Sequence, residues 1–156
     1  MQLNGLTHIH LWVRQSKGRD MTDTNILQSE VPLCELNDLQ EQQATEMVVE
    51  QRQLFAVRYN DCVYAYWNIC PHMGSPLNWV PNQFLDINKE SIQCALHGAL
   101  FEIKTGQCTM GPCYGDALQP VKLRRDKHQY FITAGQPLPP IPVNLRAQAL
   151  ADLDRE

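Results

Sequence analysis

Short runs of apolar and β-branched residues alternate with turn-forming residues from residue 31 to residue 133. The two clearest runs, residues 54–59 and 62–67, are rich in aromatic and β-branched side chains and flank the dipeptide Asn60-Asp61. A two-residue connection of this kind accepts positive φ angles and is typical of a β-hairpin. The pattern therefore predicts an all-β domain in which this hairpin is the most clearly marked element.

Other short runs predict further strands, because β-branched and aromatic residues favour a pleated surface. These runs cover residues 31–36, 46–50, 84–87, 91–94, 100–103, 121–124 and 129–133. Proline and glycine make residues 71–83 a loop, and Lys104-Thr105-Gly106 predicts a turn before a second loop through Gly111-Pro112. Residues 37–41 suit a turn or a single helical turn.

Composition divides the chain into three parts. Residues 1–30 are expected to be an N-terminal extension, residues 31–134 the folded domain, and residues 135–156 a proline-rich linker and C-terminal tail. Apolar residues recur at helical spacing in the tail, which favours a short C-terminal helix. They are Leu145, Ala149, Leu150 and Leu153.

The length and charge of the chain exclude several classes of protein. At 156 residues the chain is about one domain long, and its 44% hydrophobic and 19% charged residues are an ordinary globular mixture. The net charge of −4 argues against nucleic acid or an anionic membrane as a partner, since both need a basic surface. No apolar run approaches the roughly 20 residues that span a bilayer, and residues 1–20 lack a secretory signal. A cytoplasmic location is therefore expected.

Two thiols and two imidazoles occur in matched pairs, each pair directly after a predicted strand. The first pair is Cys70 and His72, spaced C-x-H, and the second is Cys94 and His97, spaced C-x2-H. Thiolates suit zinc or iron–sulfur centres, and imidazole binds zinc, copper or iron. Zinc modules usually show C-x2-4-C with H-x3-5-H spacing instead. The pattern favours an iron–sulfur centre with mixed ligands, and a structural zinc site is the alternative.

The segments around these pairs, residues 70–77 and 94–101, resemble the two cluster-binding motifs of the Rieske [2Fe–2S] family. The residues that follow, through Gly111-Pro112 to Pro120, are similar to Rieske ferredoxins, and the resemblance covers residues 31–133. It implies an antiparallel β-sandwich with two cluster-binding loops at one tip.

The resemblance also assigns roles to single residues. Cys70 and Cys94 would bind one iron of a [2Fe–2S] cluster, and His72 and His97 the other, more exposed iron. Gly74 and Gly98 would lie where the backbone turns sharply beside the cluster. The Gly111-Pro112 loop would cover the cluster from a third side.

The chain departs from the family pattern in the segment between its two motifs. The gap between His72 and Cys94 is longer than is usual in the ferredoxin branch, and it contains Trp79, Pro81 and Phe84. We expect an ordered insertion that packs near the cluster.

Other departures concern the reduction potential. Ser75 and Leu96 stand where respiratory Rieske proteins have disulfide-forming cysteines, so that disulfide is not expected. Ala99 and Phe101 stand where the same branch has a serine and a tyrosine that donate hydrogen bonds to cluster sulfur. Such bonds raise the potential, so a value near the lower end of the roughly −150 to +300 mV Rieske range is expected.

The remaining cysteines are expected to be buried thiols. Cys34 and Cys62 fall in predicted strands and should be core residues. Cys108 and Cys113 bracket the Gly111-Pro112 loop, where packing of two small side chains is favoured and a disulfide or redox-sensing pair is the alternative.

A centre of this type transfers one electron at a time and needs no substrate pocket. We therefore expect an electron carrier rather than an enzyme: a ferredoxin, or a small subunit that receives electrons from a reductase and supplies an oxygenase or another reductase. Electrons would leave through His72 and His97, flanked by Met73, Pro76, Ala99 and Trp79. The alternative function is a redox-sensing or structural metal-binding module.

Overall fold

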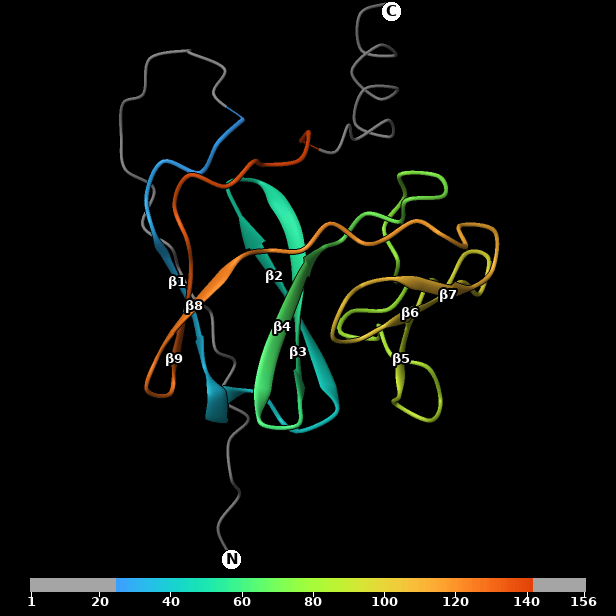
Figure 1. Cartoon of the computed structure of the whole chain (residues 1–156), viewed down its shortest axis with the longest axis horizontal. Coiled ribbons are helices and arrows are strands. Elements are labelled where there is room, and N and C mark those ends of the chain that lie inside the picture. Colours follow the sequence, from blue (N-terminus) through green and yellow to red (C-terminus); the bar gives the residue numbers. More distant parts are fainter. Residues whose placement is uncertain (1–24, 142–156) are drawn as a thin grey trace, which may run out of the picture.

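The computed structural model describes residues 25–141 and contains nine strands and one 3-10 turn within them (Figure 1). No helix in this range is long and apolar enough to cross a membrane. In chain order the elements are β1 (Val31–Glu35), η1 (Leu36–Asp38), β2 (Gln43–Val49), β3 (Arg52–Tyr59), β4 (Cys62–Trp67), β5 (Ser91–Gln93), β6 (Leu100–Glu102), β7 (Cys108–Met110), β8 (Leu123–Asp126) and β9 (Gln129–Ile132).

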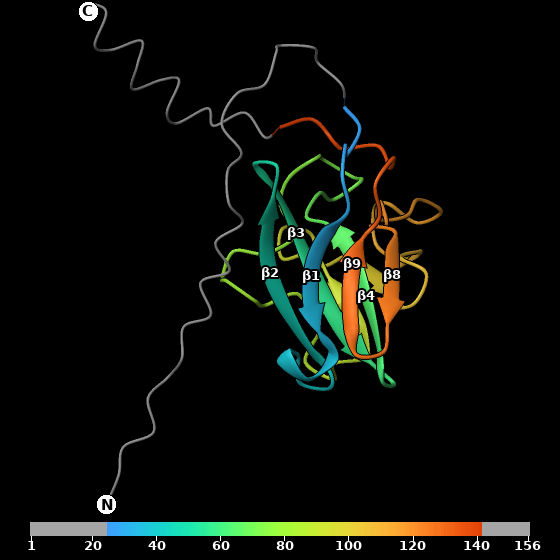
Figure 2. The same ribbon diagram turned by 90° about the vertical axis from the view of Figure 1, so that its left-hand side faces the viewer.

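The strands form three antiparallel sheets, in the orders β1-β9-β8, β2-β3-β4 and β5-β6-β7. Figure 1 shows the β2-β3-β4 sheet between the other two, and Figure 2 shows the β1-β9-β8 sheet on the side that faces the viewer there. The predicted all-β fold is confirmed, with a central sheet that is covered on both faces.

Strand β3 explains how two cores share one sheet. Leu54 and Ala56 belong to a first core, between β2-β3-β4 and β1-β9-β8, and Phe55 and Val57 belong to a second core on the opposite face. Successive side chains of a strand point to opposite faces, so a strand covered on both sides reads as a continuous apolar run. This is why residues 54–57 are all fully buried.

The predicted hairpin forms as expected. Asn60 and Asp61 have φ angles of 52° and 59°, which matches a two-residue turn with positive φ at both positions. The Glu41 carboxylate accepts hydrogen bonds from the backbone N–H groups of both residues, at 2.5 and 3.4 Å. The turn is therefore stabilised by Glu41, which lies outside the hairpin, as well as by its own backbone geometry.

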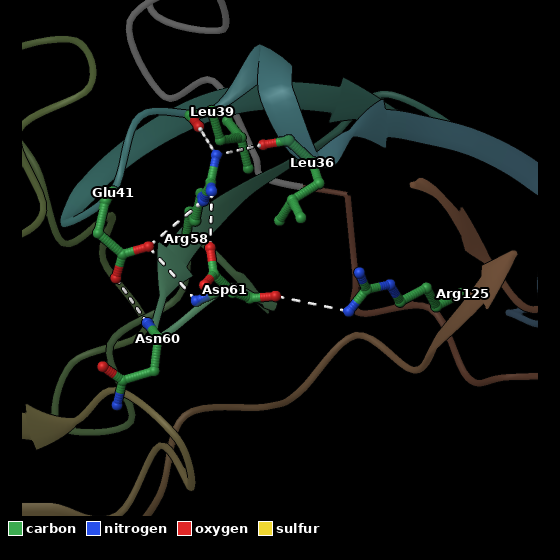
Figure 3. Close-up of polar contacts among 7 residues, drawn as sticks. All are labelled: Leu36, Leu39, Glu41, Arg58, Asn60, Asp61 and Arg125. Carbon is green, nitrogen blue, oxygen red and sulfur yellow. Dashed lines mark hydrogen bonds and ion pairs between the residues drawn. The ribbon is translucent and has the colours of Figure 1, made fainter. Parts of the chain in front are cut away.

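Arg58 links this hairpin to the chain that precedes it (Figure 3). Its guanidinium donates to the carbonyl oxygens of Leu36 and Leu39, each at 3.2 Å, and to the Asp61 carboxylate at 2.8 Å. It also lies 3.3 Å from the Glu41 carboxylate. The two carboxylates raise the pKa of Arg58, the hydrogen bond with Asp61 most of all. One side chain therefore joins η1, the following turn and the hairpin.

Some local expectations were wrong. Residues 84–87 do not form a strand: only Leu85 makes an isolated bridge, with Ile92. Residues 108–110 form β7, which was expected to be loop. Cys62 is exposed rather than buried, because it begins β4 beside the turn. The expected C-terminal helix lies outside the described residues.

Residues 135–138 lie against residues 25–27. The N–H of Leu27 donates to the carbonyl of Gln136 at 3.0 Å, and the N–H of Leu138 donates to the carbonyl of Asn25 at 2.8 Å. Leu27 and Leu138 are both buried in the first core. These two segments therefore extend the packing beyond β1 and β9.

Gly106 offers a test of packing in the second core. Its φ is +73°, and a Cβ there would lie 2.6 Å from Cε1 of Tyr66 and 3.3 Å from Cβ of Leu118. We expect Gly106→Ala to lower the free energy of unfolding by about 2–4 kcal/mol, because the cost of a left-handed backbone at alanine is added to the cost of overpacking the core. Urea unfolding measures this loss.

Gly135 supplies the matched control. Its φ is +77°, but a Cβ there would meet no atom of residues 25–141 within 4 Å. Gly135→Ala should therefore cost only the conformational strain, about 1–2 kcal/mol. Equal losses for the two variants would contradict the packing argument.

Candidate metal centre

The loop after β4 presents the first thiol and imidazole. The N–H of Cys70 donates to the carbonyl of Ser75 at 2.7 Å, and the N–H of Gly74 donates to the carbonyl of Cys70 at 2.8 Å. Gly74 has a φ of +69°, in the left-handed region that glycine reaches without strain. These bonds fold the loop back on itself, with His72 exposed at its tip and Cys70 buried at its base.

The loop after β5 repeats this geometry. The N–H of Cys94 donates to the carbonyl of Ala99 and the N–H of Gly98 donates to the carbonyl of Cys94, both at 2.9 Å. Gly98 has a φ of +70°. Ala99 in the second loop thus occupies the position that Ser75 occupies in the first.

The two loops bring their donors together as two pairs. The Nδ1 atoms of His72 and His97 are 3.2 Å apart, and both imidazoles are exposed. Cys70 and Cys94 are each only 1% exposed. Burial raises the pKa of the Cys70 thiol; the backbone N–H of His72 opposes this rise, and a hydrogen bond with Cys94 adds to it. The structure therefore assembles all four predicted donors, with the thiols inside and the imidazoles outside.

The positions of the four side chains indicate whether the site suits a single zinc ion or a two-iron cluster. The two imidazoles lie against each other at the exposed tips of the loops, and the two thiols are buried at their bases. A structural zinc site needs four donors around one point, whereas a two-iron cluster with mixed ligands needs two thiolates at one iron and two imidazoles at the other. The grouping of donors two and two fits the cluster.

Ser75 gives a second indication of fit. Its Oγ is buried and has no hydrogen-bond partner among the described residues. A buried hydroxyl without an acceptor is costly, and the sulfur atoms of an iron–sulfur cluster are acceptors. A cluster held by the adjoining loops would supply an acceptor for this hydroxyl.

Asn68 and Leu77 connect the two loops. The Oδ1 of Asn68 accepts the N–H of Leu77 at 2.8 Å, and the carbonyl of Leu77 accepts the N–H of Ala95 at 2.7 Å. Asn68 is buried, and its own N–H donates to the carbonyl of Gln53 in β3 at 2.9 Å. Sequence reasoning did not identify this role, although a polar residue between Trp67 and Ile69 was a signal for it.

The long segment between the motifs is held by a chain of side-chain amides. The Nδ2 of Asn68 donates to Asn78 at 2.8 Å, and the Nδ2 of Asn78 donates to the Glu46 carboxylate at 2.9 Å. The Oδ1 of Asn82 accepts the N–H of Glu46 at 2.8 Å. This segment therefore lies along β2.

The two aromatic residues in this segment have different environments. Phe84 stacks on Phe55 in the second core, with ring centroids 4.1 Å apart and an interplanar angle of 10°. Trp79, in contrast, is 72% exposed. The segment thus contributes one ring to the core and leaves the other at the surface.

The Gly111-Pro112 loop packs against the loop that presents Cys94 and His97. A Cβ on Gly111 would lie 2.8 Å from Cα of Ala99, so only glycine allows this approach. Beneath the loop, the sulfur atoms of Cys108 and Cys113 are 3.1 Å apart, and burial raises the pKa of the Cys113 thiol to about 12.

Ala99 and Phe101, two residues near the site, are both buried. Ala99 was expected to flank the imidazoles at the surface, but it is buried beneath Gly111. Phe101 is also fully buried in the second core. Neither side chain carries a hydrogen-bond donor.

An all-β domain in which two matched loops present two buried thiols and two exposed imidazoles has the donor set that a mixed-ligand iron–sulfur domain requires. The family model for the Rieske [2Fe-2S] domain matches residues 29–125, more than half of the chain. The chain belongs to the Rieske [2Fe-2S] domain family, whose cofactor is a [2Fe–2S] cluster.

Other proteins resemble the chain in sequence or structure. It is 27% identical to human apoptosis-inducing factor 3 over 107 residues, which are 69% of this chain and 17% of that protein. The ferredoxin of carbazole 1,9a-dioxygenase from Nocardioides aromaticivorans IC177 superposes with a TM-score of 0.56 at 24% identity, over 68% of this chain and 98% of that one. A chain from the reduced complex between oxygenase and ferredoxin in carbazole 1,9a-dioxygenase gives a TM-score of 0.59 at 18% identity, over 77% of this chain and 33% of that one. The structural matches share the β fold.

Asn68 provides a test of the connection between the loops. We expect Asn68→Ala to lower the free energy of unfolding by about 1–3 kcal/mol, because the N–H of buried Leu77 loses its acceptor. The variant should also lose its cluster to a chelator faster than the wild type. Urea unfolding and the decay of visible absorbance measure the two effects.

Asn82→Gly is the control for this prediction. It also removes one side-chain acceptor from the segment, but Asn82 is exposed, so water can replace it. Glycine keeps the φ of +64° at this position free of strain. An Asn82→Gly variant as unstable as Asn68→Ala would contradict the bridging role.

Proposed function

We propose that Cys70 and Cys94 bind one iron of the [2Fe–2S] cluster, that His72 and His97 bind the other, and that the domain carries single electrons. The observation that supports this most directly is the separation of the donors into a buried thiol pair and an exposed imidazole pair. When bound, the cluster supplies one-electron redox chemistry.

The protein provides a route for the electron at the imidazole side. Exposed imidazoles allow another protein to approach this edge of the site closely, whereas the thiol edge is covered by the second core. Large exposed apolar side chains lie on the ligand loops and on the segments beside them. They are Met73, Trp79, Val80, Leu96, Met110 and Tyr114. An apolar surface of this kind suits a short-lived complex with another redox protein.

The partners we propose are a reductase that donates electrons and an oxygenase or reductase that accepts them. The support is the likeness to a dioxygenase ferredoxin over almost the whole length of that protein, and to a chain solved in a complex of oxygenase and ferredoxin. We place this function in the cytoplasm, where six free thiols are compatible with a reducing environment.

Metal and sulfide analysis of the purified full chain tests the cofactor and its ligands. We expect about two iron and two acid-labile sulfide per chain, a brown colour and a Rieske-type EPR signal after reduction with dithionite. Cys94→Ser should lose the iron and the signal, because a thiolate ligand is removed. Cys62→Ser, which changes an exposed thiol away from the loops, should keep both.

Two outcomes would contradict this assignment. A colourless protein with zinc and no sulfide would replace it with the structural zinc site. A Cys94→Ser variant with normal iron and EPR signal would remove Cys94 from the ligand set. Absence of electron transfer from ferredoxin reductases to the intact cluster would instead favour redox sensing.

We further propose a low reduction potential, adjusted by the residue at one shared position of the two loops. In the second loop this residue is Ala99, which has no donor, and in the first it is Ser75, whose hydroxyl is buried without a hydrogen-bond partner in the part of the chain that the structure describes. Hydrogen bonds to cluster sulfur stabilise the more negative reduced state and raise the potential.

Substitutions at the shared position test this proposal. We expect Ser75→Ala to lower the midpoint potential by about 20–60 mV, the equivalent of one hydrogen bond in a one-electron step. Ala99→Ser should raise it by a similar amount. Protein-film voltammetry measures both. A wild-type midpoint well above zero, or no change in Ser75→Ala, would contradict the proposal.

A further inference from the structure

The loop that covers the second ligand loop conceals a pair of thiols. The Sγ atoms of Cys108 and Cys113 are 3.1 Å apart and share a hydrogen bond. These cysteines are 4% and 2% exposed, whereas all four residues between them are exposed. The two sulfur atoms therefore lie together directly beneath a surface loop.

The other cysteines do not form such a pair outside the metal centre. Cys34 is buried in the first core, on the far side of the central sheet, and Cys62 is exposed. Cys70 and Cys94 are the proposed iron ligands. Simple apolar packing would require only that Cys108 and Cys113 be small and buried, and would not require their sulfur atoms to be in contact.

We propose that Cys108 and Cys113 are a site of reversible oxidation, at which a low-molecular-weight disulfide such as oxidised glutathione converts the two thiols into an intramolecular disulfide. The sulfur atoms need to approach by only about 1 Å to reach a bonded distance. The site does not depend on the proposed electron transfer.

The thiol–disulfide exchange proceeds in two steps. The thiolate of one cysteine attacks a sulfur of the small disulfide, so a mixed disulfide forms and one thiol leaves with a proton. The second cysteine then attacks the protein sulfur of the mixed disulfide, and the second small thiol leaves. In sum, two protein S–H bonds are lost, one S–S bond forms, and two electrons pass to the small disulfide. Because the pair is buried, each step requires the loop to open and the exchange is slow.

The bond would fix the loop over the ligands. The disulfide closes a ring of residues 108–113. This ring includes Gly111, which packs on Ala99, and Ala99 is two residues after His97 in the chain. Because Gly111 lies directly on Ala99, opening of this loop would uncover the loop that carries Cys94 and His97. The oxidised protein should therefore lose its cluster to a chelator more slowly than the reduced protein, by about threefold or more.

Intact-mass spectrometry of the full holoprotein tests the proposal after incubation with oxidised glutathione. The Cys62→Ser background prevents a glutathione adduct at the exposed thiol. In this background we expect a mass lower by about 2 Da, for the loss of two hydrogens. Peptide mapping should place the bond between Cys108 and Cys113, and dithiothreitol should restore the starting mass.

Variants separate this site from general thiol oxidation. Cys113→Ser should lose the 2 Da change and the slower cluster loss, whereas Cys62→Ser should keep both. If Cys113→Ser does not fold, peptide mapping of the wild type decides alone. No bond between Cys108 and Cys113 under these conditions, or a bond from either of them to Cys70 or Cys94, would overturn the proposal. Equal rates of cluster loss in oxidised and reduced protein would overturn its effect on the ligand loops.

Discussion

The position of one candidate metal-binding loop relative to the other depends on the main chain of Leu77. Its N–H is held by Asn68, next to the first loop, and its carbonyl holds Ala95 in the second. The Leu77 side chain is completely buried in the second core, so this part of the backbone cannot shift without disturbing close-packed side chains. Metal ligands must be placed to within about 0.2 Å, and a rigid connection between loops from different sheets meets that requirement.

The central sheet makes this connection part of the whole fold. Strand β3 has Leu54 in the first core and Phe55 in the second, and Asn68 bonds to the carbonyl of Gln53 in the same strand. Loss of packing on either face would expose the sheet that supports the other. The site is thus built on the most buried part of the molecule, although its imidazoles are at the surface.

Local pattern was sufficient to predict much of this fold. The β3-β4 hairpin has two runs rich in aromatic and β-branched residues and a turn sequence that accepts positive φ, and the loops that present the two cysteine–histidine pairs carry their glycines where left-handed backbone is needed. Strand β7 could not be predicted, because Cys108-Thr109-Met110 becomes a strand through pairing with β6. The burial of Ala99 and the role of Asn68 arise from contacts between separate loops, which the pattern of apolar and polar residues does not encode.

The contact between residues 25–27 and 135–138 has a consequence for how such a domain can be built into larger proteins. Chain segments that enter and leave the fold at these points do so side by side, on the sheet face opposite the core that holds the thiols. A domain with adjacent points of entry and exit can be inserted into, or joined to, other modules without its ligand-bearing end being covered. The match to a single short stretch of apoptosis-inducing factor 3 is compatible with such modular use.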